Sequence, residues 1–174
     1  MRSVECSWIR SSVLINGEHV PLLEEVLDAV RDGVGLFIEI KEPDTTKRVV
    51  ELNRSRGVTV QVAIVSFYDE ALITAERVEP RIVTGLIYAQ PPGRVLTAVR
   101  LGVKVVLPHY KITSEKSISY AHRYSLKVVA RTVNSRVDAV RPVEFGVDGL
   151  TTDTPDEIIK LRSELRASTR TTRH

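Results

Sequence analysis

Two charged residues interrupt an apolar run in the segment GLFIEIKEP, residues 35–43. Side chains alternate between the two faces of a β-strand, so Glu39 and Lys41 share one face with Phe37, while the aliphatic residues between them share the other. In a (β/α) barrel that face meets the polar active site at the C-terminal mouth, where a carboxylate and an ammonium group can take part in chemistry. The competing interpretation is an edge strand whose solvent-facing charge pair contributes little energy.

Two other polar residues follow predicted strands. Ser66, in VSFYDE, either lines a pocket or shapes the start of the next helix together with Tyr68. His109, in LPHYK, stands where barrel loops carry ligand contacts, or it is an ordinary loop residue. The motifs G-x-S-x-G, H-E-x-x-H and G-x-x-x-x-G-K-[ST] are missing from the sequence, so other reaction classes lack their characteristic residues.

The elements that must position these residues alternate along the chain. Short β-branched runs predict strands at 35–41, 58–67, 81–88, 103–108, 127–134 and 148–152. Amphipathic segments predict helices at 21–33, 44–57, 68–80, 92–102, 113–126, 135–146 and 155–167. Strict alternation of this kind with short connections indicates a parallel sheet.

Helix ends carry their own signals. Gly33, Gly57, Gly102 and Gly146 follow predicted helices, where a left-handed residue ends a helix at low cost. The segment TPDE predicts Thr154 as the N-cap of the last helix, in a capping box with the glutamate three residues later.

Two α/β architectures compete, a doubly wound open sheet and a (β/α) TIM-type barrel. Central strands of a doubly wound sheet are apolar on both faces, which Glu39 and Lys41 contradict, and G-x-G-x-x-G follows none of the strands. We therefore expect a barrel with about six of the eight βα units. Residues 20–166 would form this domain, 1–19 an N-terminal segment with one extra strand at most, and 167–174 a flexible basic tail.

Composition adds few constraints. The chain has 174 residues, a net charge of +3 and one cysteine, which fits a single domain in a reducing compartment. It has neither the apolar run of a membrane span nor that of a signal peptide, so we expect a cytoplasmic protein. Aromatic residues are only 5% of the chain and show no basic, aromatic-interleaved face, which counts against nucleic acid as a partner.

Taken in order, VPLLEEVLDAV, LFIEIKEP, VSFYDEAL, HRYSLKVVARTVN and DGLTTDTPDEI resemble the glycerophosphodiester phosphodiesterase family, whose fold is a TIM barrel. The resemblance runs from about Val20 to about Ile159. It implies a hydrolase of lipid metabolism that converts a small-molecule glycerophosphodiester to sn-glycerol 3-phosphate and an alcohol with a divalent cation.

The resemblance also implies roles for single residues. Glu39 matches the glutamate of the family's IE-x-K motif, a ligand of Mg²⁺ or Ca²⁺, and Lys41 matches its lysine, a catalytic and substrate-binding residue that neutralises phosphate charge. Ser66 and His109 fall where the family lines its substrate pocket. Arg131 stands where family members commonly have tryptophan before TVN, so it either contacts phosphate or pairs with a neighbouring carboxylate.

Other family motifs have no counterpart at the corresponding positions: His-Arg-Gly, Glu-x-Asp and His-Asp on the first two strands. Hydrolysis by this chain is therefore expected to be impaired, and whether it is an enzyme stays open. The six strands suggest either a chain truncated at its N-terminus or barrel edges covered by a second copy or another chain. The alternatives are a non-catalytic phosphate-binding or assembly protein and another barrel with a phosphate site, such as a phosphosugar enzyme.

Overall fold

Six parallel strands form the centre of the molecule. The computed structural model of the chain describes residues 17, 19–29, 34–90 and 93–171, and the side chains of its last helix up to residue 164. The strands pair in chain order, β1-β2-β3-β4-β5-β6, and every pairing is parallel. Each strand is followed by a helix, as the alternation predicted.

The bounds of the elements are as follows. The strands are β1 (Leu36–Glu39), β2 (Val62–Ser66), β3 (Val83–Tyr88), β4 (Val105–Pro108), β5 (Lys127–Ala130) and β6 (Gly149–Leu150). The α-helices are α2 (Leu23–Ala29), α3 (Thr46–Ser55), α4 (Asp69–Val78), α5 (Val95–Arg100), α6 (Glu115–Arg123), α7 (Arg136–Glu144) and α8 (Pro155–Thr171). Short 3₁₀-helices are η1 (Pro43–Thr45), η2 (Thr59–Gln61) and η3 (Tyr110–Ile112).

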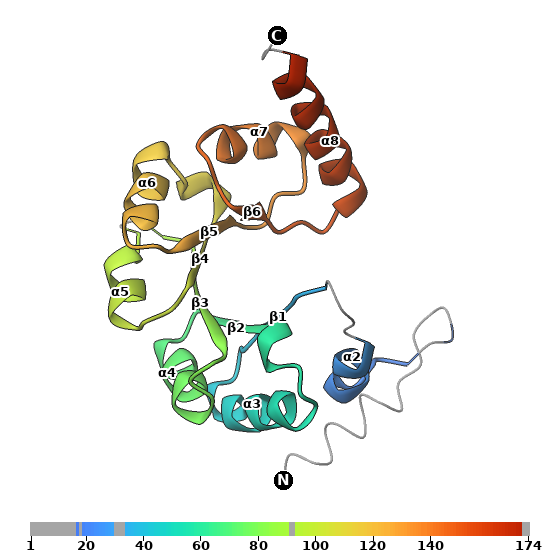
Figure 1. Ribbon diagram of the computed structural model, residues 1–174, viewed down its shortest axis with the longest axis vertical. Helices are drawn as coiled ribbons and strands as arrows, with labels where there is room; N and C mark the ends of the chain where they lie inside the picture. The colour runs from blue at the N-terminus through green and yellow to red at the C-terminus, as the bar shows by residue number, and fades with distance from the viewer. Residues whose placement is uncertain (1–16, 18, 30–33, 91–92, 172–174) are drawn as a thin grey trace.

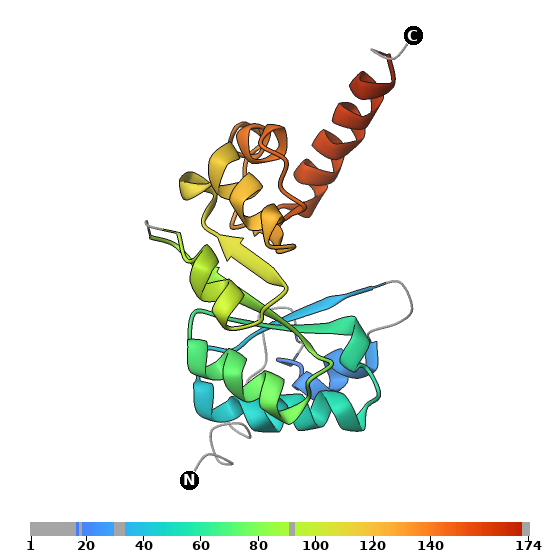
Figure 2. The same ribbon diagram turned by 60° about the vertical axis from the view of Figure 1, so that its left-hand side comes forward.

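The sheet is curled rather than flat. Figure 1 shows the strands along the inside of an arc with α3 to α7 outside it, and Figure 2 shows α8 projecting from one end. Four strand spacings separate β1 from β5, about 19 Å in a flat sheet. An ion pair nevertheless joins Glu39, the last residue of β1, to Arg131, which directly follows β5. The prediction of an incomplete (β/α) barrel is therefore confirmed.

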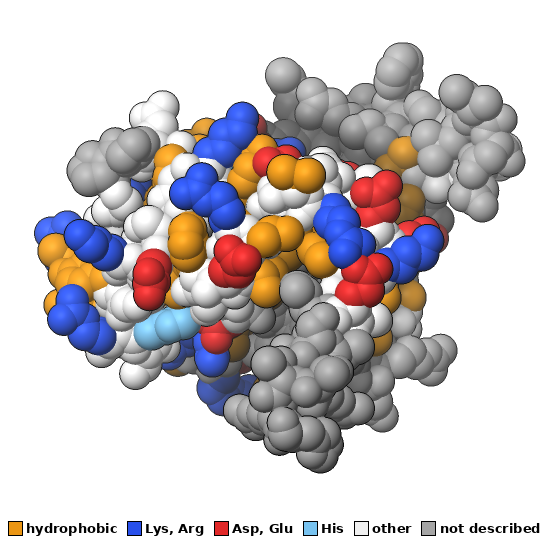
Figure 3. Space-filling view, turned by 90° about the horizontal axis from the view of Figure 1, so that it is seen from above, with side chains coloured by type: hydrophobic (Ala, Val, Ile, Leu, Met, Phe, Trp, Pro, Cys, Tyr) orange, Lys and Arg blue, Asp and Glu red, His pale blue; other side chains and the backbone are white. Residues whose placement is uncertain are grey.

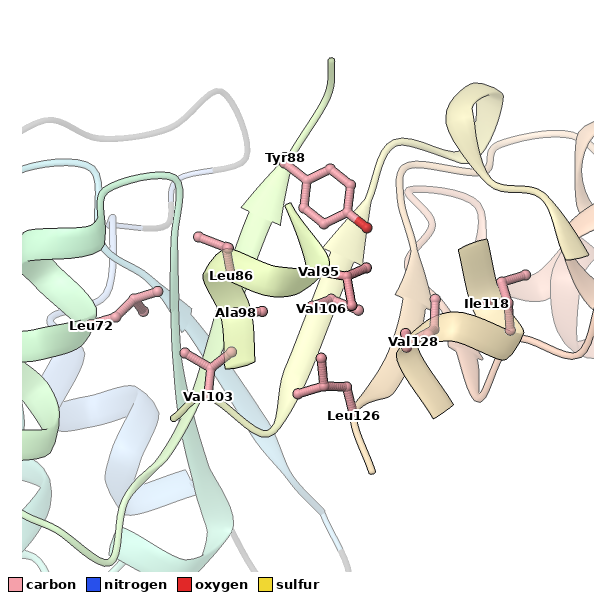
Figure 4. Close-up of a cluster of buried hydrophobic side chains, with 11 residues drawn as sticks. Leu72, Leu86, Tyr88, Val95, Ala98, Val103, Val106, Ile118, Leu126 and Val128 are labelled. Atoms are coloured by element: carbon pink, nitrogen blue, oxygen red, sulfur yellow. The ribbon is translucent and has the colours of Figure 1, made fainter. Parts of the chain in front are cut away.

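Apolar residues fill both faces of this sheet. On the outer face one cluster joins β3, β4 and β5 to α5 and α6, with Leu86, Val106 and Ile118 at most 1% exposed (Figure 4). A second cluster joins β1 and β2 to α2, α3 and α4. On the inner face a smaller cluster contains only strand residues, among them Val65 and Leu107. The helices thus fix one face of each strand, which leaves the alternate side chains to the concave face.

The β1 strand follows the predicted alternation. Leu36, Ile38 and Ile40 pack in the cluster under the helices. Phe37 lies on the opposite parity and is 45% exposed. Glu39 has the same parity as Phe37, so it belongs to the concave face.

Several local predictions can be compared with the structure. Gly57, Gly102 and Gly146 have positive φ angles after their helices, as expected, whereas Gly33 lies outside the described residues. The capping box expected at Thr154 is wrong, because the Glu157 backbone N–H donates to the Thr154 backbone carbonyl at 3.2 Å and not to its hydroxyl. That hydroxyl donates to the backbone carbonyl of Asn134 at 3.1 Å.

Domain boundaries were also predicted. Most of the N-terminal segment, residues 1–16 and 18, lies outside the part that the structure describes. Helix α8 continues to Thr171, into the segment expected to form a tail. The boundaries at residues 20 and 166 stay predictions.

Among the described residues, no helix combines the length and apolar character needed to cross a bilayer. The face seen from above in Figure 3 carries basic and acidic side chains interspersed with apolar ones. This face offers no broad patch of a single charge.

Candidate functional site

The predicted site residues follow the carboxyl ends of four different strands. Glu39 ends β1, Ser66 ends β2, His109 follows β4 and Arg131 follows β5. In parallel barrels all strand ends of this kind face the same mouth, where active sites lie. The topology therefore places these four residues at one end of the curled sheet.

Arg131 and Glu39 form an ion pair at the centre of this candidate site. The Arg131 Nη2 lies 3.7 Å from the Glu39 Oε2, with side chains that are 24% and 29% exposed. The guanidinium carbon also lies 5.3 Å from the centre of the Phe67 ring, within cation–π range. A distance of 3.7 Å is an ion pair but too long for a strong hydrogen bond, so Arg131 keeps N–H donors for another anion.

Phe67 joins the candidate site, although the sequence motifs assign no role to it. It follows β2 at the parity of Val65, whose side chain packs on the concave face, and 42% of it is exposed. Continuing the strand alternation one residue past β2 could have assigned it to the concave face.

His109 lies beside Arg131. The two residues form an isolated parallel bridge, in which the Tyr110 backbone N–H donates to the Arg131 carbonyl at 2.7 Å. The His109 Nδ1 accepts a hydrogen bond from the Lys111 backbone N–H at 3.2 Å, and the ring stacks on Tyr110 with 4.8 Å between ring centres. A neutral ring with an accepting Nδ1 carries its proton on Nε2, which is then a donor.

Lys41 and Ser66 differ in what they can offer a ligand. Lys41 is exposed and, within the described part of the chain, pairs with no acidic side chain. Ser66 is fully buried, donates to the Ile40 carbonyl at 2.7 Å and accepts from the Tyr68 N–H at 3.0 Å. These contacts favour the structural alternative for Ser66, and its role in substrate binding stays a prediction.

A divalent cation was expected at Glu39. Mg²⁺ and Ca²⁺ require several oxygen ligands, of which carboxylates are the main protein source. In the residues that the structure describes, no three His, Cys, Asp or Glu side chains come together as a metal site. Glu39 faces a guanidinium instead, so the described residues alone do not fit such a cation. Its role as a metal ligand stays a prediction.

Comparison with known proteins gives a consistent result. The family model described as the glycerophosphoryl diester phosphodiesterase family matches residues 5–157. A glycerophosphodiester phosphodiesterase of Bacillus subtilis is 29% identical over 161 residues, which cover 84% of this chain and 55% of that protein. The chain thus spans about half the length of this relative.

Solved structures share the fold. A glycerophosphodiester phosphodiesterase from Parabacteroides distasonis has a TM-score of 0.79 at 20% identity, covering 91% of this chain and 71% of that one. An Oleispira antarctica phosphodiesterase, solved in complex with its product sn-glycerol-3-phosphate, has a TM-score of 0.72 at 22% identity, covering 84% of this chain and 63% of that one. The curled sheet is thus a fold that these proteins also have.

Proposed function

The chain belongs to the glycerophosphoryl diester phosphodiesterase family, and from this membership we propose that it binds glycerophosphodiesters at the mouth formed by its strand ends. The reaction would be hydrolysis to sn-glycerol 3-phosphate and an alcohol. A structural neighbour solved with sn-glycerol-3-phosphate supports this choice of ligand.

The observation that carries the proposal is the partly exposed guanidinium of Arg131 at the strand ends. Its planar fork can donate two parallel hydrogen bonds to phosphate oxygens, an arrangement that suits arginine better than lysine. Lys41, two residues after the end of β1, would add a second positive charge at longer range. Together these two groups can bind the anionic phosphate and stabilise the charge that develops on it.

Hydrolysis also needs a proton for the leaving alcohol. A neutral His109 could donate a hydrogen bond from Nε2 to the substrate. It could not act as the general acid, because transfer of this proton would leave an unstable imidazolate anion. The sequence has no counterpart of the family's two catalytic histidines at the corresponding positions. We therefore expect slow turnover by this chain, and the second candidate is a phosphate-binding protein without catalysis.

Release of sn-glycerol 3-phosphate from glycerophosphocholine, with Mg²⁺ or with Ca²⁺, distinguishes these functions. The matched variants are Arg131→Gln and Arg100→Gln, because Arg100 is exposed at the end of α5, away from the strand ends. Turnover that falls at least tenfold only in Arg131→Gln supports the enzyme.

Calorimetric titration with sn-glycerol 3-phosphate covers the case of no turnover. Saturable binding that Arg131→Gln weakens supports the binding protein. The proposal fails if the wild-type chain neither binds nor hydrolyses these compounds with either metal.

A further inference from the structure

Glu39 already has a positively charged neighbour in this chain. The Arg131 guanidinium lies 3.7 Å from its carboxylate, and each side chain is less than one-third exposed. The two residues come from strands at opposite parts of the arc, so the contact depends on the tertiary fold and not on sequence proximity. The guanidinium thus balances the charge that a metal ion would otherwise balance.

Phe67 limits the movement of this guanidinium. The Arg131 carbon Cζ lies 5.3 Å from the ring centre, so the aromatic ring supports one side of the arginine head. The backbone of Arg131 is also fixed, since its N–H donates to the Pro108 carbonyl at 2.9 Å. A guanidinium held in this way loses little conformational entropy when an anion binds, which favours binding.

We propose that Arg131 takes the place of a divalent cation at Glu39, so that the site binds a phosphate ester without metal. This inference rests on the proposed function, because it concerns the same ligand at the same site. Among the described residues, Glu39 is the acidic side chain that forms an ion pair with Arg131. An incoming phosphate competes with Glu39 for the guanidinium, and the carboxylate therefore weakens phosphate binding.

The proposal predicts an effect of Glu39→Gln that is opposite to that expected for a metal ligand. Removing the carboxylate frees Arg131, and sn-glycerol 3-phosphate should bind about two- to fivefold more tightly in the presence of EDTA, the change that loss of a weak ion pair produces. If Glu39 holds a cation that binds phosphate, the same substitution abolishes binding. The matched control is Glu42→Gln, which removes the same charge from an exposed residue nearby.

Calorimetric titration of the full chain with sn-glycerol 3-phosphate measures both effects. For the wild-type chain we expect dissociation constants in EDTA, Mg²⁺ and Ca²⁺ that agree within about twofold. Arg131→Gln should weaken binding about tenfold or more in all three buffers, and Arg131→Lys should weaken it less because the charge remains. Thermal melting of each variant establishes that it is folded, and the arginine pair provides the test if Glu39→Gln does not fold.

The outcomes separate this inference from the proposed function. Binding that appears only with Mg²⁺ or Ca²⁺, or that Glu39→Gln abolishes, overturns the inference and leaves the proposed function standing. Absence of wild-type binding in every buffer contradicts both. Metal-independent binding that is weakened by Arg131→Gln and tightened by Glu39→Gln supports the inference.

Discussion

The carboxylate of Asp148 should contribute measurable stability at the N-terminal end of β5, the strand that Arg131 follows. Its two oxygens accept hydrogen bonds at 2.8 Å from the Lys127 Nζ and the Val128 backbone N–H, and a His122 ring nitrogen lies 2.8 Å from the second oxygen. These contacts join α6, β5 and the loop before β6. Asp148→Asn removes the charge but keeps the size of the side chain.

The magnitude follows from the pKa of this group. Burial alone would raise the pKa of Asp148, but the hydrogen bonds from Lys127, Val128 and His122 outweigh it and lower the pKa from 3.8 to about 2. A pKa lowered this far in the folded state corresponds to a stabilisation of roughly 2.5 kcal/mol at neutral pH. The side chain is 24% exposed, so solvent screening reduces our expectation to about 1–2 kcal/mol.

The sign of the pH dependence is fixed by the lowered pKa. The carboxylate stabilises the folded state above the unfolded pKa of about 4 and loses this effect as the pH falls toward about 2. At pH 7 we therefore expect Asp148→Asn to lower the free energy of unfolding by about 1–2 kcal/mol. The difference from the wild-type chain should roughly halve near pH 3.

Urea unfolding followed by circular dichroism, at pH 7 and near pH 3, measures this difference. Glu144→Gln is the control, since Glu144 is exposed at the end of α7 and we expect its stability to match the wild type. A destabilisation by Asp148→Asn that is equal at both pH values would refute the assignment of the effect to the ionised carboxylate.

Two further predictions concern the packed strands. Gly85→Ala should destabilise the chain by about 1–3 kcal/mol in urea unfolding, because an added Cβ would lie 2.9 Å from Leu107 Cδ1 and 3.0 Å from Val65 Cγ1. Gly149→Ala is the control, since its added Cβ would have its nearest contact at 3.5 Å. An equal loss of stability in the two variants would contradict this packing. Burial raises the pKa of Tyr88 to about 12, so ultraviolet titration should show one tyrosine ionising about two units above 10, and this late step should disappear in Tyr88→Phe.

The strand order and the faces of β1 could be predicted from local patterns. Alternation of β-branched and amphipathic segments encodes the parallel sheet, because each pattern depends on neighbouring residues only. The two-residue period in LFIE also assigned Phe37 and Glu39 to the face away from the helices, as the packing of Leu36 and Ile38 confirms.

Contacts that depend on tertiary geometry could not be predicted in the same way. The partner of Glu39 follows β5, and only the curvature of the sheet brings Arg131 within 3.7 Å of it. The sequence offers Arg131 two candidate partners, a phosphate and a neighbouring carboxylate, and no local pattern chooses between them. Likewise, the local pattern predicted that the Thr154 hydroxyl accepts from the Glu157 N–H. That N–H donates to the Thr154 backbone carbonyl instead, and the hydroxyl donates to the Asn134 carbonyl of another loop.

The ion pair between Glu39 and Arg131 also joins the end of β1 to the segment after β5 across the concave face of the curled sheet. Four strand-to-strand twists accumulate between its ends, so a small opening of the sheet at each pairing would separate the two groups by several ångströms. The affinity for a ligand that contacts both groups therefore depends on how easily the whole sheet changes its curvature. Substitutions in the strands between them, far from the ligand, would change affinity by altering the curvature.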